Sequence, residues 1–124
     1  MESTSIEFKV NKINDHGKSQ KRTILLKEDY LEVLNKKSRW RELMYSNITR
    51  VSFTSCSDTP EFVIHNNYGD LRFCYDKKSS DPNRDLLIRL KYLKDFFENW
   101  RPDHNIQFFS LLLPDLSIYH NTKK

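Results

Sequence analysis

The basic side chains are the residues of this chain whose types and spacing could do chemistry, and they are concentrated in its first third. Residues 9–41 hold ten Lys or Arg against four Asp or Glu, whereas residues 42–124 hold eleven of each sign. Lysine and arginine donate charge-assisted hydrogen bonds to phosphate and carboxylate oxygens. Because a cationic field confined to one region attracts anionic partners, we expect the first third to carry an anion-binding surface.

Two clusters make up this expected surface. The first is the stretch DHGKSQKR, residues 15–22, which lies between two apolar runs and holds one of the two glycines. The second consists of the basic residues around Trp40, which are Lys36, Lys37, Arg39 and Arg41. An outward-facing Trp40 would contact a lipid headgroup layer or a protein partner, and the alternative is that it packs over the strand edge. The candidate anion-binding residues are Lys12, Lys18, Lys21, Arg22, Lys36, Lys37, Arg39 and Arg41.

Other kinds of site have no pattern in the sequence. Cys56 and Cys74 have no CxxC spacing, and no histidine stands at zinc-ligand spacing from either, so we expect no metal. Ser, His and Asp form no recognisable nucleophilic constellation, and a glycine-rich phosphate loop is absent. We therefore expect neither an enzyme nor a cofactor. Without an RNP-like, KH or zinc-finger pattern, we expect no nucleic-acid partner.

Apolar residues alternate with polar ones over most of the first 76 residues, which predicts seven short strands. In the first of them, Ile6, Phe8 and Val10 share one face. The expected strands lie in residues 5–13, in 22–36 as two strands around a tight turn, in 39–45, in 48–55, and in 61–76 as a hairpin that turns through Asn66–Gly69.

The period then changes to that of a helix. Ser80 or Asp81 is suited to cap its N-terminus, with Pro82 near the first helical position, and Pro102 ends it. Apolar residues at spacings of four and three form the stripe expected to face the core: Leu86, Leu90, Leu93, Phe97 and Trp100. The chain length suffices for one hydrophobic core.

Residues 103–124 form a C-terminal extension that is more apolar than a free tail. It either packs on the domain as an added strand or helix, or contacts another chain, including a second copy in a homo-oligomer. The candidate interface residues are Trp40 and, in the extension, Phe108, Phe109, Leu112, Leu116 and Tyr119.

The order of these elements resembles the pleckstrin-homology-like (PH-like) superfamily. The stretches that carry the resemblance are KRTILLKEDYLEVLN, RWRELMYSNITRV, EFVIHNNYGDLRFCYD and RDLLIRLKYLKDFFENW. The resemblance implies an α+β, mainly β fold: a seven-stranded, bent antiparallel sheet or partly open barrel, capped by one C-terminal amphipathic helix with a late tryptophan, here Trp100, against the sheet. The PH-like domain would span residues 1–102.

The resemblance also implies a function. In phosphoinositide-binding members, lysines and arginines of the first hairpin grip the headgroup; here Lys21 and Arg22 are adjacent, which departs from the usual spacing of that motif. We expect a non-catalytic module that contacts an anionic, phosphoinositide-like membrane lipid through its basic face. The alternative is a protein–protein interaction module that uses the basic face, the sheet edge or residues 106–119. No apolar run is long enough to span a bilayer and the N-terminus lacks a signal-peptide pattern, which predicts a cytoplasmic or peripheral membrane protein.

Overall fold

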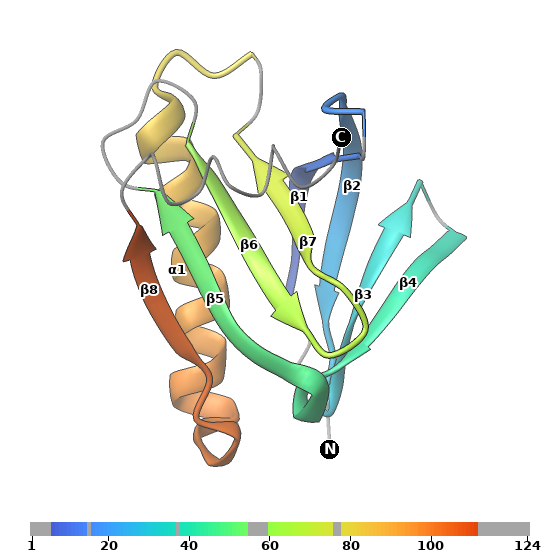
Figure 1. Ribbon diagram of the computed structural model, residues 1–124, viewed down its shortest axis with the longest axis vertical. Helices are drawn as coiled ribbons and strands as arrows, with labels where there is room; N and C mark the ends of the chain where they lie inside the picture. The colour runs from blue at the N-terminus through green and yellow to red at the C-terminus, as the bar shows by residue number, and fades with distance from the viewer. Residues whose placement is uncertain (1–5, 15, 37, 55–59, 76–77, 112–124) are drawn as a thin grey trace.

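The structure is a computed structural model that describes residues 6–14, 16–36, 38–54, 60–75 and 78–111, without the side chains of Arg39 and Leu111. In these residues, eight strands form one sheet in the order β4-β3-β2-β1-β7-β6-β5-β8, and one helix, α1, lies across its face (Figure 1). The elements are β1 (Ile6–Ile13), β2 (Ser19–Leu26), β3 (Tyr30–Asn35), β4 (Ser38–Met44), β5 (Ile48–Thr54), β6 (Glu61–Asn66), β7 (Leu71–Cys74), α1 (Pro82–Trp100) and β8 (Gln107–Leu111).

The expected architecture, mainly β with an open sheet capped by a C-terminal helix, is confirmed. Strands β1 to β4 and β5 to β7 form two antiparallel meanders. Strand β1 joins them, because it pairs along its whole length with β2 and at its end, from Asn11 to Ile13, with β7. Helix α1 begins at the expected cap, where the Asp81 side chain accepts a hydrogen bond from the backbone N–H of Arg84.

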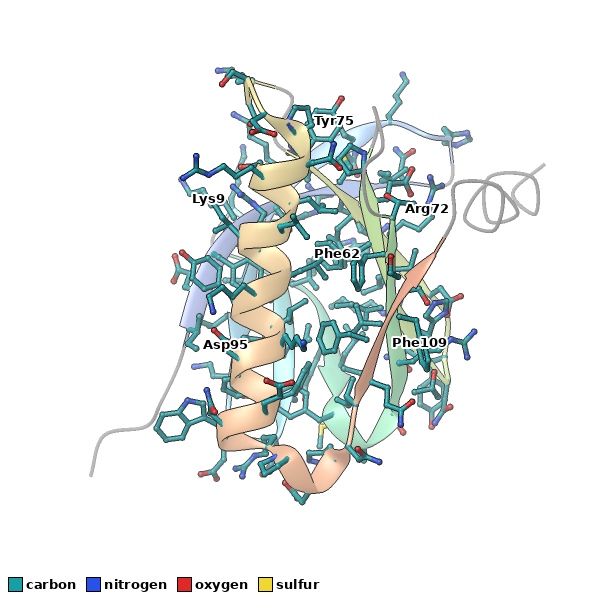
Figure 2. All side chains as sticks on the ribbon, turned by 90° about the vertical axis from the view of Figure 1, so that its left-hand side faces the viewer. Lys9, Phe62, Arg72, Tyr75, Asp95 and Phe109 are labelled. Carbon is teal, nitrogen blue, oxygen red and sulfur yellow. The ribbon has the colours of Figure 1, made fainter. Side chains whose placement is uncertain are left out.

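The core lies between the concave face of the sheet and one stripe of α1 (Figure 2). Four of the five stripe residues expected to face the sheet are buried, but Trp100 is 53% exposed, and Phe96 is buried instead. The expectation that Trp100 packs against the sheet is therefore wrong. A helix turns about 100° per residue, so Trp100 lies only about 40° around the axis from Leu86 and shares the angular position of the buried stripe; it is, however, the last residue of α1.

Tyr45 packs at the corner where β4 gives way to β5. It is buried, its hydroxyl donates to the carbonyl oxygen of Lys27 at 2.7 Å, and its ring contacts Phe96 and Phe97 with centroids 5.7 and 5.1 Å away. Burial raises the pKa of the Tyr45 phenol well above its ordinary value, so the hydroxyl stays a donor. This contact joins the β2–β3 turn to the end of α1.

Among the described residues, no helix is long and apolar enough to cross a bilayer.

The first part of the C-terminal extension adds a strand to the sheet. Strand β8 pairs in parallel with β5, from Arg50 opposite Gln107 to Thr54 opposite Leu111. The Phe108 ring lies 6.4 Å from that of Phe97 on α1. The seven expected strands thus become eight. The candidate interface residues further on, Leu112, Leu116 and Tyr119, lie outside the described residues.

The opposite face of the second meander carries a buried ion pair. The Arg72 guanidinium on β7 donates through Nε and Nη2 to the two carboxylate oxygens of Glu61 on β6, both at 3.0 Å. The two side chains are only 5% and 7% exposed. A buried charge is tolerated when a partner of opposite sign and good geometry compensates for lost hydration, as this two-pronged contact does.

Replacing one member of this pair will destabilise the fold strongly. Arg72→Met leaves the Glu61 carboxylate buried without its main partner, and we expect the free energy of unfolding to fall by about 3–5 kcal/mol. Urea unfolding followed by circular dichroism measures it. The matched control is Lys91→Met, which breaks an exposed pair with Asp95 and should change stability little. An equal, small effect of both substitutions would contradict the assignment of the Glu61–Arg72 pair as a main support of this face.

Candidate binding surface

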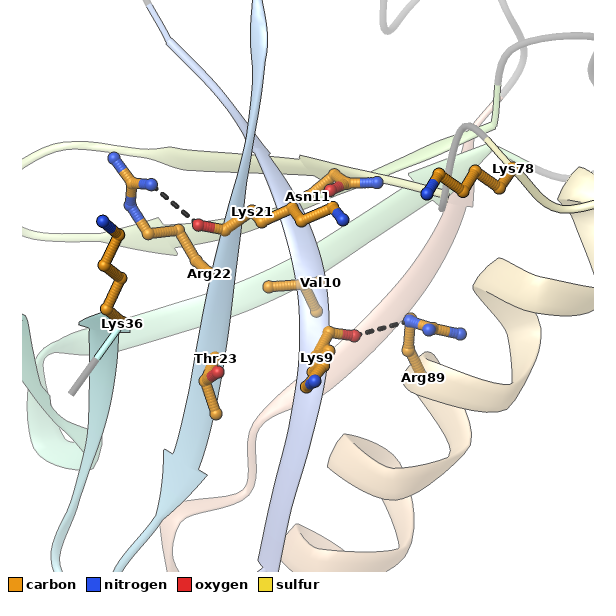
Figure 3. Close-up of a pocket in the computed structure, with 9 residues that line it drawn as sticks. All are labelled: Lys9, Val10, Asn11, Lys21, Arg22, Thr23, Lys36, Lys78 and Arg89. Atoms are coloured by element: carbon orange, nitrogen blue, oxygen red, sulfur yellow. Dashed lines mark hydrogen bonds between the residues drawn. The ribbon is translucent and has the colours of Figure 1, made fainter.

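A hollow of about 630 Å³, which we name the basic hollow, is lined mainly by cationic side chains (Figure 3). Six of its nine lining residues are Lys or Arg, and none is acidic. Like charges gathered around one space repel each other, and a bound anion relieves this repulsion. The lining residues are Lys9, Val10, Asn11, Lys21, Arg22, Thr23, Lys36, Lys78 and Arg89.

The register of the β1–β2 hairpin positions the floor of the basic hollow. Val10 lies opposite Arg22 and Asn11 opposite Lys21, so the cations of β2 stand beside the middle of β1. Lys36 joins them from the turn between β3 and β4, where it adopts a left-handed backbone conformation with φ of 62°. Such a φ is uncommon outside glycine, and here it reverses the chain between two paired strands.

Helix α1 closes one side of the basic hollow through Arg89. Its Nε donates to the carbonyl oxygen of Lys9 at 2.6 Å, as Figure 3 shows, and its Nη1 contacts the Asp85 carboxylate at 2.5 Å. Asp85 compensates part of the charge of Arg89. Arg89 therefore ties the helix to β1 and sets the width of the basic hollow, while Lys9 and Lys21, both exposed, present their ammonium groups to solvent.

The first-hairpin loop satisfies its own backbone donors. The Asn14 side-chain oxygen accepts from the N–H groups of His16 and Lys18 at 2.9 and 3.0 Å, and the Asn14 carbonyl accepts from Gly17. Gly17 has φ of 82°, which a residue without Cβ adopts readily. These three amides are occupied, so they are not free to bind an anion. Lys18 is exposed and is not one of the residues that line the basic hollow.

Trp40 forms a platform for two of the predicted anion-binding residues. The ammonium of Lys12 lies 5.4 Å from the centre of the indole and the guanidinium carbon of Arg22 lies 5.6 Å from it, both within cation–π range. Trp40 is nevertheless 42% exposed. Lys12 is buried and donates to the carbonyl oxygen of Ile13, while the buried Nε of Arg22 has no hydrogen-bond partner in the described residues.

The structure thus divides the eight predicted anion-binding residues. It gathers Lys21, Arg22 and Lys36 around the basic hollow, leaves Lys18 outside the described lining, places Lys12 against Trp40, and directs Arg41 to the carbonyl oxygen of Tyr68. The whole of Lys37 and the side chain of Arg39 are not described. Sequence reasoning passed over the hollow residues Lys78 and Arg89, because neither belongs to the basic first third and only the fold brings them next to β1. Lys9, which is not among the eight candidates, also lines the hollow.

A second polar constellation, which the sequence did not reveal, crosses β5, β6 and the turn after β6. His65 Nδ1 lies 3.1 Å from the Asp70 carboxylate and Nε2 lies 2.9 Å from the Ser52 hydroxyl. A carboxylate only accepts, so Nδ1 donates to Asp70 and Nε2 accepts from Ser52. Although this is the order of a nucleophilic triad, Ser52 and His65 are buried and line neither described hollow. We interpret it as a structural hydrogen-bond chain that connects β5, β6 and the turn after β6, which we name the His65 relay.

In the described residues, no group of His, Cys, Asp and Glu could hold a metal ion.

Comparisons with known proteins bear on the fold. The chain matches no family model and no curated protein. Among solved structures, it is similar to a chain in the structure of the Spt16D–Pob3N heterodimer, with a TM-score of 0.58 and 15% sequence identity. The likeness covers 88% of this chain and 55% of that one, so the chain spans about half of its structural neighbour. It supports a PH-like fold and, at this identity, the fold alone.

The His65 relay makes the stability of the protein depend on pH. Burial lowers the pKa of His65 below its ordinary value of 6.5, and Arg50 acts the same way, while Asp70 opposes them. As the pH falls through 6.5, the unfolded chain takes up a proton at this position more readily than the folded one, so the free energy of unfolding decreases. We expect His65→Gln to reduce this pH dependence. Thermal unfolding at neutral and mildly acidic pH measures it, and an unchanged pH slope in the variant would contradict the prediction.

Proposed function

We propose that this chain is a non-catalytic protein-interaction module that binds an acidic segment of a partner protein in the basic hollow. The observation that carries the proposal is the lining of that hollow, where the described residues supply six cationic side chains and no carboxylate. Carboxylates of Asp and Glu are ligands that lysine and arginine bind with charge-assisted hydrogen bonds.

The distribution of the cations favours an extended ligand over a single compact anion. They come from β1, β2, the turn after β3, the segment before α1 and α1 itself, and so they surround a wide space rather than converge on one point. In addition, the amides of the first-hairpin loop are already bonded and Lys12 is buried. A segment with several carboxylates along its length can meet several of these side chains at once.

The structural neighbour is consistent with a role in assembly. That chain was determined as one part of a heterodimer, which means that it contacts a second protein. For the chain described here, the same kind of role would place a partner on the basic face.

A second candidate function is binding to an anionic membrane lipid, as a peripheral protein on the cytoplasmic side. The observation that favours it is Trp40, which is exposed and flanked by Lys12 and Arg22 beside the basic hollow. An indole next to cations suits the boundary between lipid headgroups and water. Each basic residue near an anionic leaflet contributes on the order of 1 kcal/mol, so such binding would be weak and sensitive to salt.

Peptide binding by wild type and a charge-reversal variant tests the proposal. The probe is a fluorescein-labelled peptide of alternating Asp and Ser, followed by fluorescence anisotropy, with a peptide of alternating Asn and Ser as its neutral counterpart. Wild type should bind only the acidic peptide. Lys21→Glu combined with Arg22→Glu should weaken binding by roughly tenfold or more, because two attractions become repulsions.

The matched control carries the same change of charge away from the basic hollow, as Lys27→Glu combined with Lys91→Glu, and should bind almost as wild type does. Vesicles with and without phosphatidylserine or a phosphoinositide form the second arm of the test. If wild type ignores the acidic peptide but binds anionic vesicles, and the hollow variant does not, the ligand is lipid and the protein proposal is overturned. If the hollow variant binds the peptide as well as wild type does, the basic hollow is not the site.

A further inference from the structure

Trp40 occupies an irregular position in the sheet. The pairing of β3 with β4 shifts register between Val33 and Leu34, and Trp40 is the residue of β4 that the pairing passes over. An extra residue of this kind can re-aim the side chain that it carries. In the sheet, β4 is separated from β2 by one strand and from β1 by two, yet the indole contacts Arg22 of β2 and Lys12 of β1. The irregular position thus directs the indole over the β1–β2 hairpin.

Arg22 belongs both to the basic hollow and to the contact with Trp40. Its Nη1 donates to the carbonyl oxygen of Lys21 at 2.7 Å, as Figure 3 shows, and its Nη2 donates to the side-chain oxygen of Gln20 at 3.1 Å. These two bonds orient the guanidinium. Each of its terminal nitrogens carries a second N–H, which can donate to a carboxylate. A carboxylate bound by Arg22 would therefore lie beside the indole.

We propose that Trp40 is a specificity-determining residue of the basic hollow, and that it contacts an aromatic side chain within two residues of the carboxylate that Arg22 binds. This role of Trp40 rests on the proposed function, because it needs the partner's acidic segment to lie in the basic hollow. The spacing follows from the geometry of an extended chain. One or two residues advance such a chain by about 3–7 Å, which matches the 5.6 Å between the guanidinium carbon of Arg22 and the centre of the indole.

The charges around Trp40 decide which kind of side chain it can take from a ligand. Lys12 and Arg22 already lie within cation–π range of the ring, so a third cation would be repelled. The face of an aromatic ring is negative and disfavours a carboxylate, which Arg22 binds better. An uncharged side chain meets neither obstacle, and 42% of Trp40 is accessible to it. Among uncharged side chains, an aromatic one offers a large contact area and a favourable contact between rings.

Trp100 provides the matched control for Trp40. It is the same residue type and is similarly exposed, at 53%, but it is the last residue of α1 and does not line the basic hollow. A substitution at Trp100 therefore removes an exposed indole without changing the surface beside Arg22.

Paired peptides test this role on the full chain. The probes are the fluorescein-labelled peptide of alternating Asp and Ser with its central Ser replaced by Phe or by Ala, followed by fluorescence anisotropy. Wild type should bind the Phe peptide roughly tenfold more tightly than the Ala peptide. Trp40→Ala should remove this preference, Trp40→Phe should retain most of it, and Trp100→Ala should leave it unchanged.

The fluorescence of Trp40 detects the contact while the indole is still in place. Trp100→Phe leaves Trp40 as the one tryptophan of the chain. Its emission should shift to shorter wavelength when the unlabelled Phe peptide binds, because the second ring displaces water from the indole, and should shift less with the Ala peptide. Vesicles with and without anionic lipid form the other arm of this measurement.

The outcomes separate this role of Trp40 from the proposed function. If wild type binds both peptides equally, and Lys21→Glu combined with Arg22→Glu weakens both, Trp40 does not determine specificity and the proposed function stands. A preference for Phe that survives in Trp40→Ala places the aromatic contact elsewhere and also overturns the proposal. A shift of the Trp40 emission with anionic vesicles but not with the Phe peptide assigns Trp40 to a lipid surface instead. Failure of wild type to bind any acidic peptide overturns the proposed function itself, and this role of Trp40 with it.

Discussion

The double pairing of β1 is the constraint on which the rest of the structure depends. This strand pairs with β2 along its length and with β7 at its end, and so converts two antiparallel meanders into one sheet. Its inward residues, Phe8 and Val10, belong to the core. Its Lys9 carbonyl receives Arg89 from α1. The same strand thus contributes to the core, binds the helix and supplies one wall of the basic hollow. Neighbouring side chains of a strand point to opposite faces, so a register shift of one residue would move the core residues of β1 to the outer face and the outer residues into the core.

The basic hollow is a product of tertiary structure more than of local charge. Lys9 and Lys21 come from paired strands, but Lys78 and Arg89 are more than 50 residues further along the chain. Their side chains meet only because α1 packs over the sheet. Arg89 is held by hydrogen bonds to Lys9 and Asp85, whereas Lys9, Lys21 and Lys36 are exposed. The one Ser–His–Asp constellation in the described residues is enclosed between strands, apart from this hollow.

Sequence patterns predicted the elements better than their contacts. The alternation in β1, β5 and β6 and the Asp81 cap of α1 are local signals, and the structure places strands and a helix there. The exposure of Trp100 was missed because its angular position on the helix is that of the buried stripe, and periodicity alone does not distinguish the last residue of the helix from the rest. The relay through His65 and the contribution of Arg89 to the hollow depend on residues far apart in sequence, which no local period encodes. The parallel pairing of β8 with β5 is of the same kind, because the apolar extension left open whether it packs on the domain as an added strand or helix or contacts another chain.

The way in which α1 is connected has a consequence for how the protein opens. The helix is joined to β1 by Arg89 in its middle turns, and beyond its end the chain returns through Asn105, in a left-handed conformation, to form β8 beside β5. The helix is therefore connected to both halves of the sheet. Lifting it from the core would break the hydrogen bond to β1 and pull β8 away from β5. Local unfolding of the helix alone should therefore require a high free energy, and we expect the core and the surface sites to be lost together, in one cooperative unfolding step.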